Sequence, residues 1–153
     1  MDNSAKSFYS KICTWIFFCL CLAPVCSLVN TVKTNIEKTK NESSAVEAIS
    51  SIRELQYKYA AKNQGKFAPS FDELIKTGYL NLKAFRGQNP VVNDYVFEMK
   101  VTEPTAQKPA FYSINADPLS TENNNRHFYS DSTQGAIKVT EENRPANAAD
   151  PSI

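Results

Sequence analysis

The sequence has a single histidine, and it has no cysteine outside one N-terminal segment. All four cysteines lie between positions 13 and 26, so no disulfide framework can hold the rest of the chain together. The only histidine, His127, has no nucleophile-elbow or metal-ligand spacing around it. The formal net charge of +1 gives no electrostatic reason to expect a nucleic acid as partner.

One long apolar run is present, over residues 12–29 (ICTWIFFCLCLAPVCSLV). It carries no charged side chain, and about 18 apolar residues are near the minimum for crossing a bilayer core. Lys6 and Lys11 precede it, as they would in a signal peptide, and signal peptidase could cut after Ser27. We therefore expect either an uncleaved, single-pass anchor in the cytoplasmic membrane, with residues 1–11 in the cytoplasm, or export of the chain.

The cysteines inside the run favour no metal or redox site. Cys19 and Cys21 form a C-x-C pair, but thiols in a hydrocarbon environment behave mainly as small hydrophobic groups. Lipidation of Cys26 is a third possibility for the segment. It is disfavoured, because Pro24 and Val25 replace the small residues expected before a lipidated cysteine.

A long amphipathic helix follows the apolar run. Residues 30–43 are mostly polar and predict a helical stalk, and Ser44-x-x-Glu47 has the pattern of a capping box that would begin a helix over residues 44–62. Asn63-Gln64-Gly65 would end that helix, because glycine readily takes the left-handed conformation. The predicted buried stripe consists of Ile49, Ile52, Leu55 and Tyr59.

A second, short helix is indicated by Ser70-x-x-Glu73, another capping box. Leu74 and Ile75 would make its apolar contacts, and Gly78 would end it. Residues 81–94 are rich in glycine, asparagine and proline and predict a connecting loop.

The C-terminal part changes to the composition and alternation of β-strands. Turn residues 131–135 predict a hairpin between the last two strands, and residues 141–153 are expected not to pack as an element. The predicted fold class is α+β, a long helix packed on a four-stranded antiparallel sheet in a head of residues 44–142, with a flexible tail of residues 143–153. The four strands are expected at residues 95–101, 110–116, 126–130 and 136–140.

These elements, together with the phrases GKFAPSFDELIKTGYL and YVFEMKV … FYSINADP … RHFYSDSTQGAIKV, resemble a type IV pilin or a type II secretion pseudopilin. The resemblance covers roughly residues 44–142. It implies a non-enzymatic structural or accessory subunit of a bacterial secretion or surface-filament system. It also implies a head on the periplasmic or extracellular side of the membrane and other pilin-like subunits as partners.

The N-terminus departs from that family. Prepilins carry a glycine before the cleavage point and a glutamate at the fifth mature position. Here no glycine precedes Gly65, and residues 12–29 contain no acidic residue. The prepilin peptidase motif is therefore absent, and the resemblance implies a pilin-like head on an atypical anchor.

Two kinds of site remain as hypotheses. A hydrolase would have to be built on His127 with the nearby residues Asp117, Ser120, Ser130 and Asp131, but we expect His127 to face solvent or to cap the sheet. A calcium site would use the oxygens of Asp117, Asp131 and Asn123 to Asn125, although Asp117-Pro118 and Asp131-Ser132 are more typical of plain turns. We therefore assign no catalytic residue, cofactor or metal.

An exported soluble adhesion or ligand-binding module, released by signal peptidase, is the alternative function. Phe111, Tyr112, Phe128 and Tyr129 could line a patch on its sheet. Neighbouring residues of a strand point to opposite faces, so at least one aromatic of each pair is expected in the core.

Overall fold

The computed structural model describes part of the chain in full and part as backbone only. Two compact units are present, Met1–Glu37 and Lys38–Ile153. No helix within the described residues is long and apolar enough to cross a membrane. The side chains of residues 12–29 lie outside the described residues, so the interpretation of that run stays a prediction. Backbone is described for residues 3–76, 78, 83–120 and 125–153, and side chains for residues 32–76, 78, 84–120 and 125–153.

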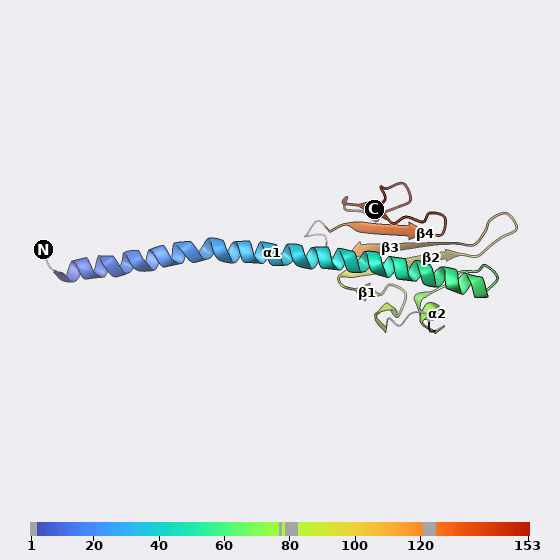
Figure 1. Ribbon diagram of the computed structural model, residues 1–153, viewed down its shortest axis with the longest axis horizontal. Helices are drawn as coiled ribbons and strands as arrows, with labels where there is room; N and C mark the ends of the chain where they lie inside the picture. The colour runs from blue at the N-terminus through green and yellow to red at the C-terminus, as the bar shows by residue number, and fades with distance from the viewer. Residues whose placement is uncertain (1–2, 77, 79–82, 121–124) are drawn as a thin grey trace. The chain divides into compact units, whose positions relative to one another are not determined.

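Helix α1 runs without interruption from Asn3 to Lys62 (Figure 1). The predicted helix over residues 44–62 is confirmed, and residues 30–43 are helical as expected. The capping box at Ser44 is wrong, because an N-cap residue lies outside the helix and Ser44 lies within it. Residues 30–43 contain no glycine or proline, so nothing interrupts the helix before Ser44.

The predicted end of the first helix and the predicted start of the second helix are confirmed. Gln64 and Gly65 have φ angles of 55° and 80°, and the Gly65 N–H donates to the Ala60 carbonyl at 2.9 Å. Helix α2 spans Phe71–Lys76, and the Ser70 Oγ accepts a hydrogen bond from the Glu73 N–H, as a capping residue does.

The sheet has five antiparallel strands in the order β1-β2-β3-β4-β5, so the prediction of four strands was one short. The missed strand pairs only through Val91 and Val92 and lies with a 3-10 helix, η1 (Lys83–Phe85), in the segment predicted as a loop. A strand of two residues is too short to show alternation in the sequence. The bounds are β1 Val91–Val92, β2 Tyr95–Thr102, β3 Phe111–Pro118, β4 His127–Asp131 and β5 Lys138–Thr140.

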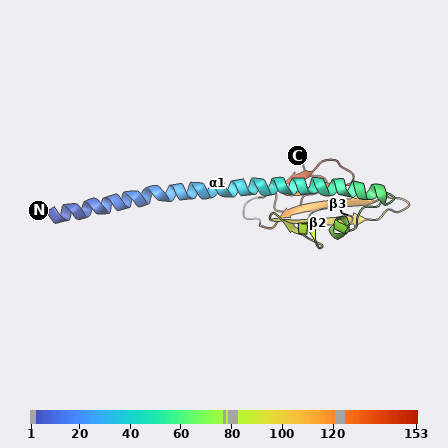
Figure 2. The same ribbon diagram turned by 60° about the horizontal axis from the view of Figure 1, so that its bottom comes forward.

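One face of the sheet packs against the C-terminal part of α1, as Figures 1 and 2 show. We call this the helix face. Of the predicted stripe, Ile49, Ile52 and Leu55 are buried and Tyr59 is half-buried. The hydrophobic core residues that the strands contribute on this face are Tyr95, Phe97, Tyr112, Ile114, Ala116 and Phe128.

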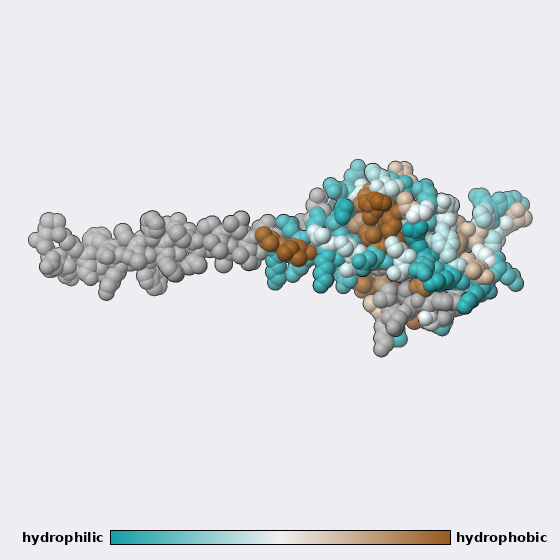
Figure 3. All heavy atoms as spheres, in the orientation of Figure 1, coloured by the Kyte–Doolittle hydropathy of each residue, from teal (hydrophilic) through white to brown (hydrophobic). Residues whose placement is uncertain are grey.

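The C-terminal segment packs on the head, so the prediction that residues 141–153 do not pack is wrong. Ala146 and Asp150 are buried, and Asn115 Nδ2 donates to the Ala146 carbonyl at 2.8 Å. Alanine, asparagine and proline carry no hydrophobic period, so the sequence gives no signal of this packing. Figure 3 shows an apolar patch where Figure 1 marks the C-terminus, and Ile153 there is 56% exposed.

Candidate functional site

His127 is buried, at 6% exposure, so the prediction that it faces solvent or caps the sheet is wrong. Strand β4 lies between β3 and β5, and a residue in an inner strand has neighbours on both sides. His127 pairs with Thr140, and the register of β3 and β4, continued one residue past Ala116 and Phe128, brings it level with Asp117. Opposite residues of antiparallel strands share one face. His127 Nδ1 lies 2.6 Å from Asp117 Oδ1, so these two predicted residues form a hydrogen-bonded pair.

Neither candidate serine completes a nucleophile, base and acid arrangement with this pair. Ser130 is three residues from His127 along β4, so the alternation of the strand puts it on the helix face, whereas His127 is on the opposite face, which we call the outer face. Ser120 is exposed beyond the end of β3, and its carbonyl accepts a hydrogen bond from Asn125 Nδ2.

Asp131 acts as a turn residue. Its Oδ1 accepts hydrogen bonds from the Thr133 N–H, the Thr133 hydroxyl and the Gln134 N–H, and its Oδ2 accepts one from the Tyr129 hydroxyl. Burial raises the pKa of the Asp131 carboxyl, but the hydrogen bonds from Thr133, Gln134 and Tyr129 together hold the pKa below its ordinary value. Burial and the bond to Asp131 raise the pKa of Tyr129 to about 12.

The two aspartates of the calcium hypothesis do not meet. Asp131 lies opposite Ser113, and Asp117 lies four residues farther along β3, which is about 13 Å at the rise of a strand. Of the three asparagines, Asn123 and Asn124 lie outside the described residues. Among the residues that are described, no three histidine, cysteine, aspartate or glutamate side chains converge as metal ligands do.

The four candidate aromatics divide between the two faces, which confirms the prediction that each pair contributes to the core. Tyr112 and Phe128 are fully buried on the helix face, whereas Phe111 and Tyr129 are half-buried on the outer face. Tyr129 lies opposite Asn115, four residues from Phe111, so these two rings do not form a continuous stripe.

A buried ion pair that was not predicted from the sequence joins α1 to the start of β4. Glu42 is 5% exposed, and its carboxylate accepts hydrogen bonds from the Arg126 N–H at 3.2 Å and the Arg126 Nε at 3.0 Å. The Arg126 guanidinium also lies 2.8 Å from this carboxylate and remains 37% exposed. A signal was present, because Glu42 and Gln56 continue the spacing of the buried helix stripe, and a polar residue on such a stripe needs a partner.

Gln56 is the second polar residue of that stripe. It is fully buried, and its Nε2 donates to the Ala68 carbonyl at 3.0 Å while its Oε1 accepts from the Ala68 N–H at 2.8 Å. The side chain thus pairs both polar groups of one residue in the connection between α1 and α2. It stabilises the loop and leaves no group for a ligand.

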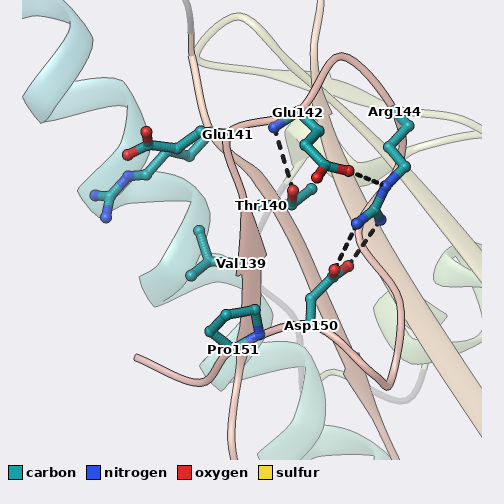
Figure 4. Close-up of a pocket in the computed structure, with 8 residues that line it drawn as sticks. Val139, Thr140, Glu141, Glu142, Arg144, Asp150 and Pro151 are labelled. Carbon is teal, nitrogen blue, oxygen red and sulfur yellow. Dashed lines mark hydrogen bonds and ion pairs between the residues drawn. The ribbon is translucent and has the colours of Figure 1, made fainter.

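The remaining candidate is an open pocket of about 610 Å³ beside β5 and the C-terminal segment (Figure 4). Arg144 is one of its lining residues, with its guanidinium bound to Asp150 at 2.6 and 2.9 Å and its Nε bound to the Glu142 carboxylate at 2.6 Å. The residues that line the pocket are Arg126, Val139, Thr140, Glu141, Glu142, Arg144, Asp150 and Pro151.

The charged groups around Arg144 are bound to one another. The bonds from Arg144, with a further bond from the Asn147 N–H, lower the pKa of the Asp150 carboxyl to about 2. Asp150 therefore stays ionised at neutral pH and remains paired with Arg144. An arginine held by two carboxylates connects two parts of the C-terminal segment, and it offers little free charge to a ligand.

Comparison with protein-family models, with curated proteins and with solved structures finds no match to this chain.

Proposed function

We propose that this chain is a non-enzymatic, pilin-like subunit of a bacterial secretion or surface-filament system. In this proposal residues 12–29 anchor it in the cytoplasmic membrane, and the head lies on the periplasmic or extracellular side. Other pilin-like subunits are its partners. The anchor is atypical, because the prepilin peptidase motif is absent.

The observation that carries the proposal is the length of α1 together with the packing of its C-terminal part on the sheet. Helix α1 continues from Asn3 to Lys62, and its last turns supply the stripe that covers an antiparallel meander. In a pilin-like subunit one long helix both packs on the head and provides the attachment, and the proposal assigns these roles to the C-terminal part of α1 and to residues 12–29. The long polar stretch before residue 44 contributes little to the core of the head.

Exposed apolar residues on α1 also support a partner. Val32 and Ile36 are 57% and 63% exposed, and residues four apart lie on the same side of a helix. Apolar groups at this spacing suit contact with a helix of another subunit. The proposal therefore assigns this side of α1 to subunit contact.

The non-enzymatic part of the proposal has its support in the side chains that would have to carry a reaction. His127 is paired with Asp117, but Ser130 lies on the opposite face of the sheet. Asp131 uses its oxygens within a turn, and Arg144 is bound by two carboxylates. Each of these groups is engaged by a structural partner.

The decisive experiment is the intact mass and N-terminal sequence of the native protein in the membrane, sheared-surface and soluble fractions. The proposal expects a chain that starts near Met1 in the membrane fraction. A photocrosslinker at Ile36 should capture another pilin-like subunit. The same group at Glu37 is the matched control and should capture less, because the next residue of a helix points about 100° away.

A soluble chain that starts near Leu28 would contradict the proposal and favour the second candidate, an exported ligand-binding module. The observation in favour of that module is the open pocket beside β5. A module of this kind would remain a single species in solution and would give no crosslink to a pilin-like subunit at Ile36.

A further inference from the structure

The last residues of the chain cover the free edge of β5. Strand β5 is the end of the sheet, and an uncovered edge presents unpaired N–H and C=O groups to any other strand. Here the Val139 N–H donates to the Pro151 carbonyl at 2.9 Å, and the Ile153 N–H donates to the Ile137 carbonyl at 3.0 Å. Ser152 pairs with Lys138 as an antiparallel bridge, and its hydroxyl accepts a hydrogen bond from Lys138 Nζ at 3.0 Å.

These bonds use the outward-facing groups of β5. Alternate residues of an edge strand direct their backbone groups toward the neighbouring strand and away from it. Val139 and Ile137 bond to the C-terminal residues, so theirs are the groups that point away from β4. Removal of residues 151–153 would leave these groups unpaired without breaking the ladder between β4 and β5.

A second set of contacts holds the covering residues in place. Arg144 binds the Asp150 carboxylate through two nitrogens, and the Asp150 Oδ2 also accepts the Asn147 N–H at 2.8 Å. Asp150 directly precedes Pro151 in the chain, so this closed turn delivers Pro151 to the Val139 N–H. Arg144 is therefore a positioning residue for the edge cover.

We propose that Pro151–Ile153 is a built-in blocking strand, and that its release opens the edge of β5 to pairing with β5 of a second copy of this chain. The same edge of two copies can pair antiparallel about a two-fold axis, with Val139 opposite Val139 and two hydrogen bonds exchanged between them. Val139 is half-buried, so the edge itself carries an apolar side chain, which favours association once the segment moves.

The test uses the full chain in detergent micelles and a truncation that removes residues 151–153 but keeps Arg144 and Asp150. Analytical ultracentrifugation should show that the truncated chain forms a species of twice the protein mass of the full chain at equal concentration. In hydrogen exchange, the Val139 amide of the truncated chain should lose protection at low protein concentration and regain it as the chain associates. The mass readout is relative to the full chain, so it holds whether or not α1 serves as a membrane anchor.

The matched control is the same truncation with Val139→Pro, which removes the outward N–H and should return the mass to that of the full chain. An unchanged mass for the truncated chain with an unprotected Val139 amide would overturn the proposal, because an open edge would then attract no second copy. Equal association of the truncated chain with and without Val139→Pro would also overturn it.

A milder variant decides the question if truncation unfolds the head. Ile153→Pro removes a single donor, the N–H that binds the Ile137 carbonyl. Greater association than that of the unaltered chain supports the blocking strand, and unchanged association overturns it. Arg144→Gln should lower the protection of the Val139 amide without a change in that of Val96, whose strand lies at the other side of the sheet.

Discussion

The two faces of the sheet are covered by different chemistry. The helix face is an array of rings and aliphatic side chains, with the Phe85 and Phe97 rings 4.9 Å apart and the Phe67 and Tyr112 rings 4.6 Å apart. The outer face instead carries the pairs His127 with Asp117 and Tyr129 with Asp131. Apolar burial is non-directional and scales with area, whereas hydrogen bonds need particular partners. The helix face therefore supplies most of the stability. The outer face supplies directional contacts, among them the bond from Asn115 to the C-terminal residue Ala146.

The largest expected difference comes from two neighbouring residues of β4. Phe128→Ala should lower the free energy of unfolding by about 3 to 5 kcal/mol, because it removes a fully buried ring from the helix face. Tyr129→Phe should cost only about 0.5 to 1.5 kcal/mol, because it removes one hydrogen bond from the outer face. Urea unfolding followed by near-ultraviolet circular dichroism measures both. Equal losses in the free energy of unfolding would contradict the conclusion that the helix face supplies most of the stability.

The next effect concerns the ion pair that links α1 to β4. Glu42→Ala should cost about 1 to 3 kcal/mol, because the Arg126 N–H and side chain lose their acceptor. The loss stays below that of a fully buried pair, since the Arg126 side chain is 37% exposed and can bind water. Glu47→Ala, at an exposed position of the same helix, is the control and should change stability by less than about 0.5 kcal/mol. If the two variants lose the same stability, the ion pair contributes nothing specific.

A smaller effect is expected at the turn after β4. Asp131→Asn should cost about 1 to 2 kcal/mol at neutral pH, because an amide accepts the bonds from Thr133 and Gln134 less strongly than a carboxylate. The folded pKa of Asp131 is lowered, so its contribution is complete above the unfolded pKa of about 3.9 and is lost as pH falls through the folded value. The difference between the two proteins should thus shrink below about pH 4, which acid titration of the urea midpoint measures. A difference in stability between the two proteins that stays constant with pH would show that the charge of the Asp131 carboxylate does not stabilise the turn.

The sequence was sufficient to predict the burial on the helix face and insufficient to predict the contacts of the outer face. The physical reason is that the first depends on neighbours in the sequence and the second on residues far apart in the chain. Ile49, Ile52 and Leu55 show their burial by spacing alone, and the end of α1 at Gly65 depends on one residue's freedom at positive φ. The bond from Asn115 to Ala146 joins residues 31 apart, and neither residue type marks its partner. A contact of this kind depends on how the chain folds back on the sheet, which local sequence does not show.

The candidate site divides in the same way. Asp117 and His127 were recognised as neighbours in sequence, but only the register of β3 and β4 puts them directly opposite each other. The same register separates Ser130 from His127, which proximity in the chain does not reveal. Arg144 and Asp150 lie in a segment without periodic pattern, where composition alone pointed to a chain that does not pack.

The smallest expected effect on global stability is at Asp150, and it separates local order from folding. Asp150→Asn removes the carboxylate that holds Arg144, so the Val139 amide should lose protection from hydrogen exchange while the urea midpoint hardly moves. In the unaltered chain the pKa of Asp150 is lowered to about 2. The contribution of this ion pair is therefore complete above about pH 4 and is lost as pH falls toward 2. The protection factor of Val139 should follow that titration in the unaltered chain and stay low and constant in Asp150→Asn, with the Phe97 amide of β2 as the internal control. A Val139 amide that is equally protected in both proteins at neutral pH would show that Pro151 reaches the edge of β5 without the ion pair, and that hydrogen bonding at the edge alone orders the C-terminus.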